Sequence, residues 1–308
     1  MINKIIRYYN QNRKRIWWVL LICAMVILAI QLLNYLAKMN HKKSDNNNQI
    51  ITYNEDKKMT QSVINDKKID ESTAQKNNNL IQEFVDFCNA GKVDSAYNLL
   101  SDDCKNNVFT NEENFKQNYY NLIFKEQKHF SKENWLNSKS TSITYKINYT
   151  NDLLADGYYK EENIFSDYIT TVKENNIDKL NISNFIGSET LEKKYEDKYI
   201  QLYVQKKCTF MNEEKYEISI KNNTQYNILL YDIDSDSKWM IEDEDTLDYS
   251  AMDLTDEGKI ALEPKEEKKI TVRFSKTYNP DKEDKLIKLQ NITIQNESND
   301  KLNIEVKL

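Results

Sequence analysis

The sequence predicts an N-terminal transmembrane helix, then an α+β domain, then an all-β sandwich. Three observations predict this order. An uncharged run of 22 residues lies near the N-terminus, apolar residues recur at three- and four-residue spacing from Leu80, and the spacing changes to alternation after Trp135. Because helices and strands follow one another in separate blocks, the organisation is α+β rather than α/β.

The uncharged run covers residues 16–37. About 20 apolar residues at 1.5 Å each cross a hydrocarbon core of ~30 Å, so the run predicts one membrane span, with the lipid bilayer as a partner. Five Lys or Arg precede it and three follow it closely, which favours a cytoplasmic N-terminus and extracellular C-terminal domains at the cell membrane. The alternative is a cleaved signal peptide, but the run is longer than a typical signal core.

The segment after this run is polar and charged, with too few apolar residues to build a core, and is expected to be a flexible stalk. A charged stretch at 189–198 is expected to separate the two folded domains. The predicted organisation is a basic cytoplasmic tail at 1–15, a transmembrane helix at 16–37, a stalk at 38–77, an α+β domain at 78–190 and a β-sandwich at 199–308.

The α+β domain begins with an amphipathic helix from Leu80 to Cys88, which Gly91 ends as a C-cap. A second helix follows at 93–100. A third begins at Thr110, where Glu113 three residues later completes a capping box. Strands are then predicted at 143–149, 168–173 and 180–186, the last two joined by a polar turn at 175–176.

The C-terminal part alternates apolar and polar residues almost throughout. Short strands of this kind in about 110 residues predict two packed antiparallel sheets. They are expected at 199–210, 216–221, 227–231, 269–274, 286–294 and 302–308.

Charge and glycine content exclude several functions. Residues 1–43 hold eight of the 43 Lys and Arg and no acid, so residues 44–308 carry 35 bases against 49 acids, or −14. Such a chain repels nucleic acid. Four glycines in 308 residues build neither GxGxxG nor a Walker A loop, and no cofactor is expected.

The stretch FVDFCNAGKVDSAYNLLS at 84–101 resembles the opening of nuclear transport factor 2-like domains, a resemblance that would cover 78–190. The stretches YEISIKNN at 216–223 and LEPKEEKKI at 262–270 are similar to small bacterial immunoglobulin-like surface domains. The whole chain resembles single-pass membrane proteins of low-GC Gram-positive bacteria. Its layout is also similar to that of the bitopic scaffold subunit of conjugation machines.

The resemblance implies a cone that encloses a pocket for a small ligand. Aromatic residues in the predicted third helix and strands are able to line it, although the same spacing suits a packed core. An isomerase-like site would need a carboxylate among them, and none is apparent. The candidate lining residues are Tyr119, Tyr120, Trp135, Tyr145 and Tyr149.

A weak calcium site is a second candidate. Asp232, Asp234 and Asp236 imitate the start of a calcium-binding loop, but Ser237 stands where the loop requires glycine and Asp243 where it requires glutamate. The other interpretation is an ordinary acidic loop between strands.

A disulfide between Cys88 and Cys104 is the third candidate feature. With 15 residues between them, a disulfide would restrict the unfolded chain by about 3 kcal/mol. A plain antiparallel helix pair would hold the two apart, so a bridge needs the segment 101–109 to fold back. A disulfide and two free thiols both remain open.

These observations predict a non-enzymatic, membrane-anchored, extracytoplasmic binding or scaffolding protein. Its partner is expected to be another protein or a second copy of the chain. The alternatives are a scaffold subunit of a conjugation or secretion complex, and a carrier or sensor of a small apolar ligand in the cone. A cone enzyme is the least favoured, because it would need a carboxylate buried beside the aromatic residues, and the sequence places none there.

Overall fold

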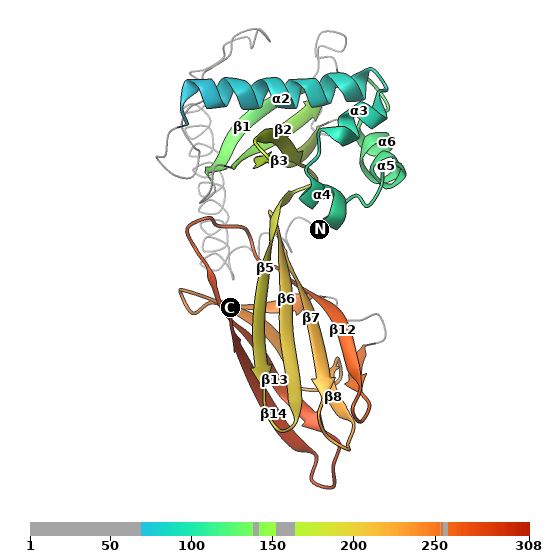
Figure 1. The fold of residues 1–308 in the computed structure, drawn as a ribbon, viewed down its shortest axis with the longest axis vertical. Helices are drawn as coiled ribbons and strands as arrows, with labels where there is room; N and C mark the ends of the chain where they lie inside the picture. Colours follow the sequence, from blue (N-terminus) through green and yellow to red (C-terminus); the bar gives the residue numbers. More distant parts are fainter. Residues whose placement is uncertain (1–68, 138–141, 152–163, 253, 255–257) are drawn as a thin grey trace, which may run out of the picture. The chain divides into compact units, whose positions relative to one another are not determined.

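The computed structural model describes residues 69–137, 142–151, 164–252, 254 and 258–308. Half of these residues lie in strands. Figure 1 shows a helix-containing part, with a small sheet, that leads directly into the long strands of a larger sheet. All described residues belong to one compact unit.

The longest described helix begins where its N-terminal amides find a cap. The Asp70 carboxylate accepts hydrogen bonds from the backbone N–H groups of Ser72 and Thr73, which satisfies two otherwise unpaired donors. Gly91, with φ of +70°, follows its end. The helices are α2 (Glu71–Asn89), α3 (Val93–Asn98), α4 (Asp102–Asn107), α5 (Glu112–Phe115), the π-helix η2 (Lys116–Tyr120) and α6 (Asn121–Ile123).

Helix α2 packs across a four-stranded antiparallel sheet (Figure 1). Its buried face includes Phe84 and Cys88, and the Asn77 amide donates a hydrogen bond of 3.0 Å to the Tyr145 hydroxyl. The strands, in spatial order, are β1 (His129–Asn137), β2 (Ile143–Thr150), β3 (Phe165–Glu174) and β4 (Ile177–Asn181).

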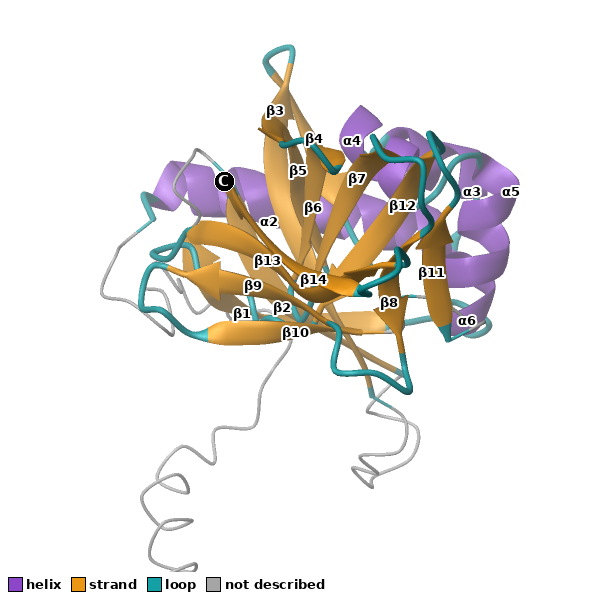
Figure 2. Cartoon of the chain, turned by 90° about the horizontal axis from the view of Figure 1, so that it is seen from below, coloured by secondary structure: helices purple, strands orange, loops and turns teal. Residues whose placement is uncertain are grey.

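The larger sheet folds over a second apolar core that contains Trp239 and Tyr216. Strand β10 pairs with β9 at one end and β12 at the other, and so joins the two layers seen in Figure 2. The order is β11-β8-β13-β9-β10-β12-β7-β6-β5, with β14 paired to β13. The strands are β5 (Phe185–Glu196), β6 (Ile200–Phe210), β7 (Glu214–Asn222), β8 (Ile228–Asp232), β9 (Lys238–Asp243), β10 (Asp248–Met252), β11 (Lys259–Leu262), β12 (Glu267–Phe274), β13 (Asp284–Ile294) and β14 (Asp300–Lys307).

The structure corrects the expected fold class. The described part of the chain is mostly β, and its helices and strands do not form the expected nuclear transport factor 2-like α+β cone. The charged stretch at 189–198, expected to separate two domains, lies largely inside β5, which pairs with β6 from Phe185 to Glu196. Because β5 is an edge strand, it tolerates the charged side chains that suggested a linker.

The membrane interpretation also needs correction. Within the described ranges, no helix is both long and apolar enough to cross a bilayer. The segment expected to do so, residues 16–37, lies outside those ranges, as does the tail at 1–15. The expected stalk at 38–77 is described only from residue 69, and from Glu71 onward it forms the first turns of α2.

Candidate functional site

Four charged side chains meet inside the larger sheet, and we call them the charge cluster: Lys207, Glu214, Lys276 and Asp284. Strand register explains why they meet. Lys207 on β6 pairs with Tyr216 on β7, two residues from Glu214. Glu214 in turn pairs with Phe274 on β12, so the chain brings Lys276, two residues later, back beside it. Asp284 begins β13.

The Asp284 carboxylate is the centre of the charge cluster. Its Oδ2 contacts the Lys207 amine and accepts a hydrogen bond of 2.7 Å from the Tyr216 hydroxyl, and its Oδ1 contacts the Lys276 amine. The Glu214 Oε1 lies 3.3 Å from the Lys207 Nζ and 3.5 Å from the Lys276 Nζ. The side chains of Glu214 and Asp284 are 3% exposed, that of Lys276 5% and that of Lys207 14%.

Two positive and two negative charges balance here, which is the condition for burying them at tolerable cost. Burial disfavours the charged form of Asp284, but Lys207 and Lys276 outweigh it and hold the pKa at about 2. Burial alone would lower the pKa of Lys207. The negative charges of Glu214 and Asp284 raise this pKa by more, so the Lys207 pKa lies above its ordinary value of 10.5. For Glu214 burial dominates and raises the pKa.

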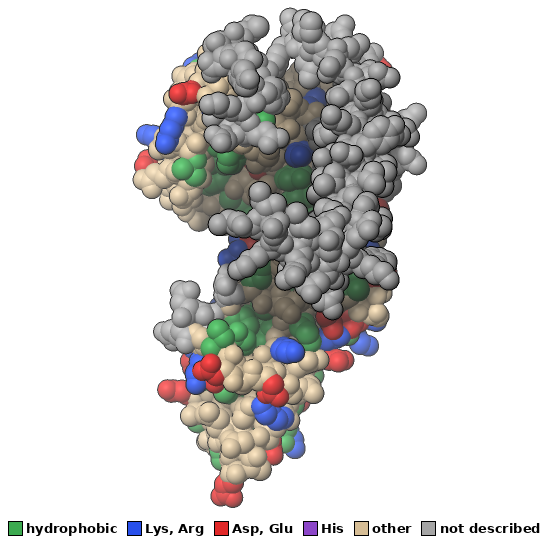
Figure 3. Space-filling model, turned by 180° about the vertical axis from the view of Figure 1, so that it is seen from behind, with side chains coloured by type: hydrophobic (Ala, Val, Ile, Leu, Met, Phe, Trp, Pro, Cys, Tyr) green, Lys and Arg blue, Asp and Glu red, His purple; other side chains and the backbone are tan. Residues whose placement is uncertain are grey.

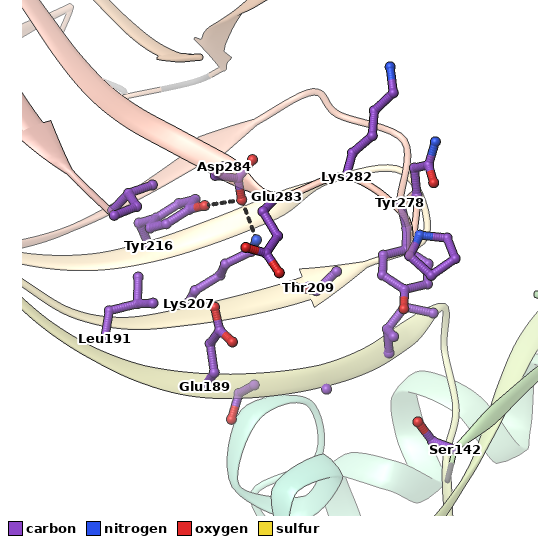
Figure 4. Close-up of a pocket in the computed structure, with 16 residues that line it drawn as sticks. Ser142, Glu189, Leu191, Lys207, Thr209, Tyr216, Tyr278, Lys282, Glu283 and Asp284 are labelled. Atoms are coloured by element: carbon purple, nitrogen blue, oxygen red, sulfur yellow. Dashed lines mark hydrogen bonds and ion pairs between the residues drawn. The ribbon is translucent and has the colours of Figure 1, made fainter. Parts of the chain in front are cut away.

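A pocket of about 440 Å³ lies beside the charge cluster (Figure 4). Its walls come from the first half of β5, from β6, and from the segment 278–284 before and into β13. Figure 4 shows the carboxylates of Glu189 and Glu283 directed toward the region around the Lys207 amine. With Asp284 they place three carboxylates in a lining that holds two ammonium groups, those of Lys207 and Lys282.

Tyr278 fixes the apolar wall of the pocket. Its backbone N–H donates a hydrogen bond of 2.8 Å to the Met211 carbonyl, and its ring packs with Ile186 and Met211. Burial raises the pKa of Tyr278 to about 12, so its hydroxyl stays protonated at neutral pH. The segment that carries Tyr278 is thereby tied to the β6–β7 turn.

No protein family, curated protein or solved structure matches this chain. The site is therefore interpreted from its own geometry. Sequence reasoning missed it, because its charged residues lie up to 77 positions apart and only the strand register brings them together.

The aromatic residues proposed from the sequence as a pocket lining form a packed core instead. Tyr119, Tyr145 and Tyr149 are at most 2% exposed. Phenylalanine rings fill the space around them, and Tyr120 stacks on Phe124. Trp135 lies in β1, and its side chain is outside the described part of the structure. This arrangement gives no support to a ligand cavity between these residues.

Sequence reasoning also missed a buried acid among these tyrosines. Asp167 accepts a hydrogen bond of 2.6 Å from the Tyr119 hydroxyl and others from the backbone N–H groups of Tyr168, Ser183 and Asn184, at 2.7, 3.0 and 2.8 Å. Burial raises the pKa of Asp167, although these four donors oppose it. Because all its contacts are internal, we assign Asp167 a structural role.

The three aspartates proposed for calcium do not converge. Asp232 accepts from the Asp234 N–H and pairs with Lys259 at 3.1 Å, whereas Asp236 pairs with Lys301 at 2.9 Å. Across the ranges that the structure describes, no three acidic, histidine or cysteine side chains are placed to hold a metal ion.

Cys88, Cys104 and Cys208 are free and buried. Burial raises the pKa of all three thiols, to about 12 for Cys104. We therefore expect none of them to react with iodoacetamide in the native protein, and all three to react after denaturation without reductant, as peptide mapping would show. A Cys88–Cys104 pair that reacts only after reduction would contradict this expectation.

Proposed function

We propose that this protein is a binding or scaffolding protein that recognises a basic side chain of a partner protein in the pocket beside the charge cluster. The observation that carries the proposal is the lining: an excess of carboxylate over ammonium groups, combined with apolar walls, around a volume of about 440 Å³. Pockets of about 300–1,000 Å³ are typical of specific ligand sites.

The two kinds of wall suit the two halves of a lysine or arginine side chain. Such side chains bury their methylene stems on apolar surface and keep the charged end near polar groups. Leu191 and Ile186 supply apolar surface, and the Tyr278 ring adds an aromatic face on which a cation can lie. Glu189 and Glu283 supply the carboxylates.

The rest of the molecule supports a basic partner. The excess of acids over bases in residues 44–308 attracts cationic groups and repels acidic ones. On the face shown in Figure 3, charged side chains of both signs are interspersed over the larger sheet. A basic side chain would therefore find a more specific binding site in the carboxylate-rich pocket than on this surface of mixed charge. Its floor is fixed by the ion pairs of the charge cluster, so little ordering is needed on binding.

The test is a comparison of two peptide libraries of randomised heptapeptides, one with a fixed central arginine and one with citrulline, its neutral isostere. We expect the protein to retain arginine peptides only. For the best of them, E189Q/E283Q is expected to raise Kd about tenfold, which corresponds to about 1.4 kcal/mol, in fluorescence anisotropy. The variant E305Q, on the exposed face of β14, is the matched control.

Equal retention of the two libraries, or an unchanged Kd in E189Q/E283Q, would show that the pocket does not recognise a basic side chain. Affinity should also fall as salt is raised, because the contact is electrostatic and partly exposed.

A further inference from the structure

Strand β14 forms an edge of the larger sheet. It pairs with β13, and β5 from the other layer approaches it, but among the residues that the structure describes no second strand pairs with β14. An edge strand presents unpaired N–H and C=O groups to which another strand can bind. Which strand binds there depends on the side chains that stand beside those groups.

The backbone of β14 shows which of its residues face the open edge. The Leu308 N–H donates a hydrogen bond of 3.0 Å to the Lys285 carbonyl on β13. Because the N–H groups of successive residues in a strand point to opposite sides, even-numbered residues of β14 address β13 and odd-numbered residues address the open edge. The odd-numbered residues all have exposed side chains, and they are Lys301, Asn303, Glu305 and Lys307.

We propose that β14 pairs in antiparallel orientation with β14 of a second copy of this chain, so that the larger sheets of two copies join into one. Such a contact has the same residues on both sides of a two-fold axis. The inference is independent of the proposed function, because none of the four odd-numbered residues lines the pocket.

Symmetry and charge together select one register. A two-fold axis perpendicular to the joined sheet places one residue directly opposite its own copy. Backbone pairing requires that this central residue face the open edge, so only the four odd-numbered residues qualify. With Lys301, Glu305 or Lys307 at the centre, like charges would lie directly opposite each other, which destabilises a sheet. Asn303 is uncharged, so the register centred on Asn303 avoids this repulsion.

The register centred on Asn303 also brings opposite charges together. Lys301 of each copy lies opposite Glu305 of the other copy, which gives two favourable pairs on the outer face of the joined sheet. On the inner face, the half-buried Leu302 lies opposite the buried Ile304 of the other copy, so the two apolar cores meet. Charges on an edge strand commonly oppose pairing, whereas on β14 their order favours it in this register.

An exchange of charges tests the pairing in the purified full chain. K301E places a glutamate opposite Glu305, and E305K places a lysine opposite Lys301, so each variant has two like-charge pairs across the axis. We expect light scattering to show dimers of the wild type and a dimer Kd raised about tenfold or more in each variant. An equimolar mixture of the two variants is expected to dimerise again, because every such pair then joins a lysine to a glutamate.

The matched control is K269E, which reverses an exposed charge on β12. We expect K269E to dimerise like the wild type, and circular dichroism checks that all variants are folded. Because the mixture contains the same two substitutions as the separate variants, damage to the fold would persist in it, whereas repulsion between copies would not.

Cysteine variants test the register itself. Two residues that face each other in a hydrogen-bonded antiparallel pair have Cα atoms about 5.5 Å apart, which suits a disulfide. We expect N303C to form a covalent dimer on mild oxidation, beyond the background of the wild type, on a non-reducing gel. K307C is the control, because Lys307 lies opposite Asn299 of the other copy in this register.

A wild-type chain that stays monomeric at its highest soluble concentration would overturn the proposal. So would dimers that K301E and E305K leave intact, or a mixture of these two variants that stays monomeric. Equal covalent dimerisation of N303C and K307C would overturn the register centred on Asn303.

Discussion

Replacing Asp167 with asparagine is expected to destabilise the protein by about 3 kcal/mol, because buried donors lose their acceptor. Each oxygen of the Asp167 carboxylate accepts two hydrogen bonds: Oδ2 from the Tyr119 hydroxyl and the Ser183 N–H, and Oδ1 from the N–H groups of Tyr168 and Asn184. An asparagine has the same size but only one acceptor oxygen. Its NH₂ group would therefore face two donors, whichever way the amide is turned.

Chemical denaturation of D167N and of the wild type, followed by circular dichroism, measures this loss. The control is D178N on the neighbouring strand β4, where the carboxylate pairs with a 60% exposed Lys76 and a loss below about 1 kcal/mol is expected. A D167N chain as stable as D178N would show that the four hydrogen bonds contribute little.

The same variant carries a pH signature. Burial raises the folded-state pKa of Asp167 above its ordinary value of 3.8, so the folded state binds a proton more tightly than the unfolded state does. The contribution of Asp167 to stability is then complete below pH 3.8 and declines as the pH rises through the folded-state pKa. We expect the stability gap between wild type and D167N to narrow over that range. A gap that widens with pH would mean that the four donors outweigh burial.

Asp167 also illustrates what sequence reasoning can reach. Apolar spacing is a local signal and therefore indicates helices and strands. Tyr119 was expected in a helix and Tyr145 and Tyr149 in a strand, and they lie in η2 and β2. Their acid partner is not local to them: it receives two of its donors from the turn at 183–184, where both residues have φ of +61°. The phenylalanines that fill the space between them were visible in the sequence, but not the way they pack.

Local signals predicted several elements. The start of α2 was placed too late, yet its end at Gly91 and the β3–β4 turn at Asn175 and Asn176, both with positive φ, agree with the structure. Strands β9, β10 and β11 were not expected, because with 6, 5 and 4 residues they are too short to show a clear alternation. The boundary error at β5 has another origin: a charged edge strand and a linker share a composition.

The charge cluster could not be predicted at all. Lys207, Glu214, Lys276 and Asp284 lie on three strands and a loop, in a chain where 30% of residues are charged. Nothing local distinguishes them from their solvent-exposed neighbours. Only the pairing of β6 with β7 and of β7 with β12 selects them, and register is a property of the whole sheet.

Replacing Asn222 with alanine is expected to destabilise the protein by about 3 kcal/mol, because the change removes the hydrogen bonds of a fully buried side chain and leaves a cavity. The Asn222 side chain, fully buried at the end of β7, connects two turns. Its amide donates to the carbonyls of Tyr226 and Glu263 at 2.7 and 2.8 Å, and its oxygen accepts from the Thr224 N–H and hydroxyl, each at 2.8 Å.

N223A is the matched control, because the Asn223 side chain makes one hydrogen bond of 3.3 Å and is partly exposed. Urea denaturation of both variants against the wild type separates the two cases, with less than about 1 kcal/mol expected for N223A. N222D is a second comparison. The aspartate keeps the size and the acceptor oxygen of Asn222, but a carboxylate oxygen replaces the NH₂ group and faces the carbonyl oxygens of Tyr226 and Glu263. We therefore expect N222D to be at least as unstable as N222A. If N222D were as stable as the wild type, the network at the end of β7 would be held by its acceptor alone, and the link between the β7–β8 and β11–β12 turns would carry no free energy.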